Sequence, residues 1–88
     1  MKAVITVLGR DRTGIIAEVS GLLYHEDVNI LDISQTILSD MFTMIMLVEI
    51  GQDLKYDVVR EKLLKLADNM ALEIRVQRSD IFDAMHRI

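Results

Sequence analysis

The chain has 88 residues, of which 51% are apolar, and its formal net charge is −4 at neutral pH. This length accommodates one domain, and the apolar content is sufficient for a packed core. The acidic balance disfavours a nucleic-acid binder, which needs clustered lysine and arginine. The sequence has no cysteine, which excludes disulfides and thiolate metal sites and fits the reducing cytoplasm, where we expect the protein to function.

Other functional classes are disfavoured by what the sequence does not contain. No apolar stretch approaches the ~18–20 residues of a membrane span, and the N-terminus has no signal-peptide pattern. The two histidines, His25 and His86, are too few for a histidine metal site and have no arguable acidic partner. Ser20 and Ser34 lack a base that would activate them. We therefore expect no membrane association, metal, cofactor or catalytic residue, and a binding module rather than an enzyme.

The first half of the chain predicts a strand, a turn, a helix and a second strand. Residues 2–8 are apolar on both faces, which is typical of a central strand. The polar turn of residues 9–14 precedes apolar residues at helical spacing between Ile15 and Leu23. We expect this helix to be capped by Asp11 or Thr13 and to end near residues 25–26. Residues 28–38 predict the second strand.

The second half repeats this order and adds a tail. A tight turn at residues 39–40 leads into a strand of residues 41–50, also apolar on both faces. Residues 54–69 predict a helix, and residues 71–78 alternate as a strand does. The apolar face predicted for this second helix contains Val58, Val59, Leu63, Leu66 and Met70. Residues 79–88 predict a short C-terminal helix capped by Ser79.

The order βαββαβ predicts an α+β domain with the ferredoxin-like fold over residues 1–78, followed by the helical tail 79–88. Right-handed crossovers give one antiparallel sheet with both helices on one face and with the first and third strands in the centre. The other face also looks apolar, and we expect the tail to cover it, in the same chain or across a dimer. The tail residues that would do so are Ile81, Phe82, Met85 and Ile88. Met41, Met44 and Met46 are expected to pack in the core.

The two edge strands of the predicted sheet differ in charge. The fourth strand carries Glu73, Arg75 and Arg78, which discourage pairing with another chain, whereas residues 28–38 contain one charge, Asp32. We expect two copies to pair through residues 28–38 in a homodimer with a continuous eight-stranded sheet. The alternative is that a loop or the tail covers this edge in a monomer.

The turn before the first helix suits a zwitterionic ligand. A carboxylate can accept from N–H groups near Gly14 and Ile15, and Asp11 can pair with an ammonium group. Asn29 can both donate and accept. The first helix separates Asp11 from Asn29 by nearly ~18 Å, so one ligand could contact both only across a dimer. The same residues are also explained by helix capping and turn formation alone.

These residues resemble the ACT domain family of small-molecule regulatory domains. The resemblance rests on Asp11-Arg12-Thr13-Gly14-Ile15 at the start of the first helix and on Val28-Asn29-Ile30 at the start of the second strand. It covers nearly the whole chain and is closest to free-standing single-ACT proteins. Glycine-cleavage regulatory proteins and the N-terminal domains of formyltetrahydrofolate deformylases are similar at the first of these segments.

The resemblance implies a ligand, most often an amino acid, at the seam of a homodimer. It implies that the turn before the first helix contacts the ligand from one subunit and that Asn29 contacts it from the other. The residues implied are Gly9, Asp11, Arg12, Thr13, Gly14, Ile15, Asn29 and Ile30. Many members have proline where this chain has Thr13, and serine binders have asparagine where it has Asp11. A possible partner is an enzyme or regulator; the alternative function is an interaction subunit that docks a polypeptide without a small molecule.

Overall fold

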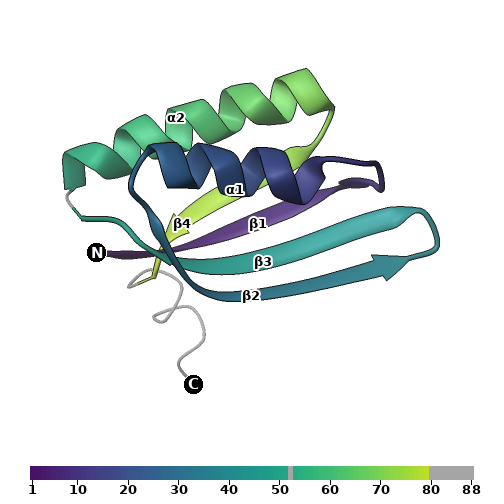
Figure 1. Ribbon diagram of the computed structural model, residues 1–88, viewed down its shortest axis with the longest axis horizontal. Helices are drawn as coiled ribbons and strands as arrows, with labels where there is room; N and C mark the ends of the chain where they lie inside the picture. The colour runs from purple at the N-terminus through teal and green to yellow at the C-terminus, as the bar shows by residue number, and fades with distance from the viewer. Residues whose placement is uncertain (52, 80–88) are drawn as a thin grey trace.

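The protein forms one antiparallel sheet covered on one face by two helices. The computed structural model describes residues 1–51 and 53–79, with residues 53 and 54 described by their backbone alone. The strand order is β2-β3-β1-β4, and both helices lie on the same face of the sheet (Figure 1). The elements are β1 (Lys2–Arg10), α1 (Ile15–His25), β2 (Asn29–Leu38), β3 (Met41–Glu49), α2 (Asp53–Met70) and β4 (Glu73–Arg78).

This architecture confirms the predicted ferredoxin-like fold, with β1 and β3 in the centre of the sheet. The helices follow the same right-handed crossover rule in both βαβ units. The predicted C-terminal helix spans residues 79–88, of which residues 80–88 lie outside the described residues.

The core lies between the sheet and the two helices, because alternate residues of each strand face the helices. Ile5 and Val7 of β1 and Met44 and Met46 of β3 are completely buried there. Met41 is exposed, so its predicted place in the core is wrong. It alternates with Phe42 and therefore points to the sheet face that carries no helix, which we call the open face.

Each helix buries a narrower stripe than the sequence pattern predicted. Ile15, Val19 and Leu23 of α1 are buried, but Ile16 is exposed. In α2 the buried side chains belong to Val59, Leu63, Ala67 and Met70, whereas Val58, predicted on the same face, is exposed. Residues at the margin of a 3.6-residue pattern stay outside the contact when the neighbouring helix does not reach them.

Strand β1 continues two residues further than predicted, through Gly9 and Arg10. Gly9 pairs with Phe42 of β3, so the turn before α1 begins at Asp11. A Cβ atom at Gly9 would lie 2.5 Å from Cδ2 of Leu72, which leads into β4. The close approach of these two segments is therefore a packing reason for glycine at position 9, independent of any ligand.

Both helices end in the same hydrogen-bonded motif with a left-handed residue. After α1, Val28 N–H donates to the Leu23 carbonyl over 2.9 Å, and Asp27 has φ 58°. After α2, Leu72 N–H donates to the Ala67 carbonyl over 2.8 Å, and Ala71 has φ 55°. Glycine is the residue best suited to this position, since a Cβ atom there crowds the backbone.

Replacing Ala71 with glycine should stabilise the protein. The left-handed conformation costs a non-glycine residue ~1–2 kcal/mol, and glycine gives back ~0.4–1 kcal/mol through the freedom of the unfolded chain. We expect a net gain of roughly 0.5–1 kcal/mol, measured as a higher urea midpoint with unchanged slope. Ala17→Gly, inside α1, is the control and should lose about 1 kcal/mol; a loss at position 71 as well would contradict the assignment.

Candidate ligand site and dimer edge

The turn before α1 ends in a glycine rather than in a polar cap. Gly14 has φ 95° and is the N-cap residue, with no side chain capping the helix, so the prediction that Asp11 or Thr13 caps it is wrong. The first helical hydrogen bond runs from Glu18 N–H to the Gly14 carbonyl. The N–H groups of Ile15, Ile16 and Ala17 therefore lie outside the helical ladder, where an anion would be favoured.

The turn is also open on the side of its glycine. Apart from Gly14 and its two chain neighbours, no heavy atom of residues 1–51 and 53–79 lies within 4 Å of the position that a Cβ would take at Gly14. Asp11, Arg12 and Thr13 are exposed. The start of α1 thus combines free backbone donors with space for a ligand atom to approach them.

Three polar contacts tie this turn to distant parts of the chain. Asp11 N–H donates to the Asp40 carbonyl over 2.7 Å, and Arg10 Nε lies 3.5 Å from the Asp40 carboxylate. The turn therefore sits beside the hairpin between β2 and β3, at the same end of the molecule (Figure 1). Arg12 donates to the Met70 carbonyl over 3.1 Å, so its guanidinium caps the C-terminus of α2.

Asn29 lies at the opposite end of α1 from this turn. It is exposed, begins β2 and pairs with Glu49 of β3, while Ile30 is partly buried against the core. Helix α1 has 11 residues, so its two ends are separated by roughly 16 Å. The turn and Asn29 are thus apart within one chain, and Figure 1 shows the turn and the start of β2 at opposite ends of α1.

The free edge of β2 is apolar and accessible along its length. Every residue from Leu31 to Leu38 is exposed, including Ile33 at 44% and Ile37 at 52%. A register shift between Ile30 and Asp32 bulges the strand near its start, but no charge other than Asp32 interrupts it. An exposed edge of this kind is a template for pairing with another strand. The opposite edge strand, β4, instead exposes a Glu73–Arg75 ion pair of 2.9 Å.

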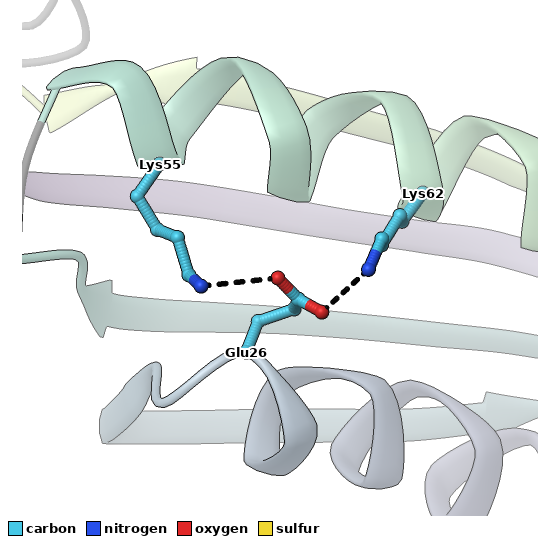
Figure 2. Close-up of polar contacts among 3 residues, drawn as sticks. All are labelled: Glu26, Lys55 and Lys62. Carbon is cyan, nitrogen blue, oxygen red and sulfur yellow. Dashed lines mark hydrogen bonds and ion pairs between the residues drawn. The ribbon is translucent and has the colours of Figure 1, made fainter.

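A carboxylate clasp fixes the end of α1 that leads to Asn29. Glu26 lies 3.2 Å from Lys55 and 2.6 Å from Lys62, both on α2 (Figure 2). A carboxylate at a helix C-terminus is unfavourable because of the helix dipole, and the two ammonium groups offset this. Hydrogen bonds from Lys62 and then from Lys55 lower the pKa of the Glu26 carboxyl below its ordinary value of 4.5.

This clasp should contribute to acid stability. The pKa of the Glu26 carboxyl is lower in the folded protein than its value near 4.5 in the unfolded chain. The ionised carboxylate therefore contributes its full share of the unfolding free energy above pH ~4.5, and this contribution is lost as the pH falls through the folded-state pKa. Glu26→Gln should therefore flatten the acid side of a curve of unfolding free energy against pH. Glu61→Gln, which disrupts an exposed pair on α2, is the control and should leave the curve nearly unchanged. An acid limb identical to wild type in Glu26→Gln would contradict the role of the clasp.

The described residues contain neither a cluster of metal-ligating side chains nor a membrane-spanning helix. Within residues 1–51 and 53–79, no three His, Cys, Asp or Glu side chains gather in a way that could hold a metal ion. In that same part of the chain, no helix combines the length and apolarity needed to cross a bilayer. What the turn and Asn29 do offer is hydrogen bonding and charge, which suits binding.

The sequence pattern did not reveal the residues that hold the site in position. In the sequence pattern Asp40 belongs only to a turn, and Glu26 is only an acid at the end of a predicted helix. The hydrogen bond between Asp11 and Asp40 joins residues that are 29 positions apart in the sequence. The ion pairs of Glu26 with Lys55 and Lys62 join residues that are 29 and 36 positions apart. The unfavourable position of Glu26 relative to the dipole was the one local sign that it needed partners.

Comparisons with known proteins agree with this fold. The chain matches the ACT domain family over residues 2–77. It is 49% identical to a UPF0237 protein of Clostridium perfringens, over 100% of both chains, and 43% identical to one of Methanopyrus kandleri, over 99% of this chain and 98% of that one. Among solved structures, an ACT domain protein from Streptococcus pneumoniae is 41% identical, with a TM-score of 0.80 over 98% of each chain. The chain belongs to the ACT domain family, whose members are generally regulatory, ligand-binding domains.

Proposed function

We propose that the protein is a cytoplasmic regulatory module that binds an amino acid between two identical subunits. The subunits would pair antiparallel through the exposed edge of β2, giving an eight-stranded sheet. Ligand binding would then change the population of dimer states or the affinity for a partner enzyme or regulator.

One contact carries this proposal: the 2.7 Å hydrogen bond from Asp11 N–H to the Asp40 carbonyl. It fixes the turn before α1 beside the end of β2. In an antiparallel β2–β2 pair related by a two-fold axis, the end of one strand lies beside the start of the other. The turn of one subunit would therefore meet Asn29 of its partner, although the two lie at opposite ends of α1 in one chain.

Each part of the proposed site has a distinct role. The free N–H groups of Ile15, Ile16 and Ala17 would donate to the ligand carboxylate, and the Asp11 carboxylate would pair with the ligand's ammonium group. Asn29 of the partner subunit would complete the polar contacts, and Ile30 would line the pocket. Thr13 and Gly14 would shape the turn, and Gly9 would lie beside it at the end of β1. Arg12 would position the turn through its hydrogen bond to the Met70 carbonyl.

A thermal-shift screen of the twenty amino acids tests this function. A ligand at ~100 times its dissociation constant stabilises the folded protein by ~2.7 kcal/mol, which corresponds to about 10 °C or more for a domain of this size. We expect one amino acid, or a small group of related ones, to give such a shift. The same shift from all twenty, or from none, would contradict amino-acid sensing.

The exposed β2 edge also supports a second candidate function. Leu31, Ile33 and Ile37 are exposed there, so an extended segment of another protein could add to the sheet as a strand. In that case the protein would be an interaction subunit without a small-molecule ligand. A monomer that binds a polypeptide stoichiometrically and responds to no amino acid would favour this function.

A further inference from the structure

The surface of β2 on the helix side of the sheet is only partly covered. Ile33 pairs with Met46 and Ile37 pairs with Phe42, and directly opposed residues of antiparallel strands point to the same face. Met46 and Phe42 are buried in the core beneath the helices, so Ile33 and Ile37 also point to the helix side. They are nevertheless 44% and 52% exposed. The helices therefore do not extend over β2, and an apolar strip made of Ile33 and Ile37 is left accessible along this edge.

Ile16 lies on the side of α1 that is turned toward this strip. Gly21 and His25 line a cavity of about 300 Å³ together with Leu66 of α2, so their side of α1 faces α2. Ile16 precedes them by five and nine residues, which places it about 140° and 180° around the helix from them. Helix α2 packs against β4, at the edge of the sheet opposite β2, and Figure 1 shows α1 nearer to β2 than α2 is. Ile16, which is 39% exposed, therefore points toward the β2 edge.

Ile16 and Ile37 lie at the same end of the molecule as the turn before α1. Ile37, Phe42 and Gly9 form one row across β2, β3 and β1. Ile37 is therefore two strand spacings, or ~10 Å, from Gly9, where β1 leads into the turn. Ile16 belongs to the first turn of α1, and its N–H is one of the donors outside the helical ladder. Two exposed apolar side chains thus flank the free backbone donors.

The charged groups of the turn do not suit a charged ligand side chain. Arg10 lies 3.5 Å from the Asp40 carboxylate, and Arg12 donates to the Met70 carbonyl, so both arginines are already engaged. An acidic ligand side chain would also meet the carboxylates of Asp11 and Asp40. A basic side chain against the apolar strip would lose hydration without gaining an ion pair, because Asp11 is the partner of the ligand's ammonium group. An uncharged apolar side chain incurs neither cost.

We propose that the ligand is an amino acid with an aliphatic side chain, and that Ile16 and Ile37 select it. This inference rests on the proposed function, because β2 of the partner subunit would close the strip on its free side. A ligand carboxylate held by the free N–H groups of α1 would direct the ligand side chain between Ile16 and Ile37. Burial there contributes about fourfold in affinity for each methylene group of the ligand, or ~0.8 kcal/mol.

A homologous series of ligands measures this contribution in the full-length protein. Titration calorimetry with alanine, 2-aminobutyrate and norvaline lengthens the ligand side chain by one methylene at a time and leaves its ammonium and carboxylate groups unchanged. We expect the affinity to rise about fourfold at each step, and about 16-fold from alanine to norvaline. Equal affinities across the series, or tighter binding of aspartate or lysine than of norvaline, would overturn the aliphatic class and leave amino-acid binding intact. No binding of any amino acid would overturn the proposed function, and this inference with it.

Matched variants assign the selectivity to the two isoleucines. Ile16→Thr and Ile37→Thr each keep a β-branched side chain but replace exposed apolar surface with a hydroxyl group. Each should lower the ratio of norvaline affinity to alanine affinity by about fourfold. Ile45→Thr, on the open face of β3 and 48% exposed, is the control and should keep the wild-type ratio. A merely structural role would weaken both ligands equally, so an unchanged ratio in Ile16→Thr and Ile37→Thr would overturn their assignment.

Discussion

Replacing Ile33 and Ile37 with lysine should convert the proposed dimer to a monomer at micromolar concentration, and sedimentation velocity is the measurement that checks it. Both side chains belong to the exposed edge strand β2. In the proposed seam each would bury its remaining exposed surface, which is about half of the side chain and worth roughly 0.8–1.5 kcal/mol. The two-fold axis brings identical residues near one another, so lysine adds like-charge repulsion to this loss. We expect the dimer dissociation constant to rise by at least about a hundredfold, or ~2.8 kcal/mol.

The chain provides a matched control for this change. Val58 and Leu64 on α2 are exposed to similar fractions, 43% and 36%. Val58→Lys with Leu64→Lys therefore introduces the same charges in place of comparable apolar surface, away from β2. This variant should remain a dimer. Dissociation of both double variants, or a wild-type protein that is already monomeric, would place the seam elsewhere or remove it.

Asn29→Ala should lower the affinity for the stabilising amino acid by roughly 10–100-fold without dissociating the dimer. A hydrogen bond to a charged ligand group contributes about 1.5–3 kcal/mol, and every 1.4 kcal/mol corresponds to about tenfold in affinity. The side chain is exposed at the start of β2, so its removal leaves the core unchanged. Titration calorimetry measures the affinity, and Ser34→Ala, also exposed on β2, serves as the control.

A mixture of two weakly binding variants then tests whether each site is shared between subunits. Asp11→Ala removes the carboxylate of the turn, and Asn29→Ala removes the side-chain amide of the partner subunit. If these homodimers are unfolded together and refolded, random pairing makes about half of the dimers mixed, and each mixed dimer has one intact site of two. Ligand binding should return at about a quarter of the wild-type stoichiometry with wild-type affinity. No recovery would mean that both residues serve one subunit or that neither contacts the ligand.

Much of the fold was predictable because it depends on short-range patterns. Two-sided apolar strands at residues 2–8 and 41–50 indicated the central positions that β1 and β3 occupy. Helical spacing predicted α1 and α2, and their ends differ from the predictions by only a residue or two. The residues around Gly14 and Asn29 sufficed to identify the family, since its signature lies in two local segments.

The prediction of buried side chains failed for residues at the margin of an apolar face or at the end of a strand. Ile16 and Val58 match the apolar stripe by spacing but are exposed. Met41 is the first residue of the apolar strand β3, yet its side chain faces the open face. Periodicity gives the direction of a side chain, whereas its burial depends on what lies opposite, and that depends on how far the neighbouring element extends.

By itself, the sequence determined the order of elements, the two central strands and the chemical character of the turn before α1. Only the tertiary structure decided how that turn is held. It assigned the N-cap to Gly14, directed Arg12 to the α2 carbonyl of Met70, and joined Asp11 to Asp40. These contacts connect residues 29 and 58 positions apart. No local periodicity encodes such distances, because packing of the sheet and helices is what brings those groups within hydrogen-bonding reach.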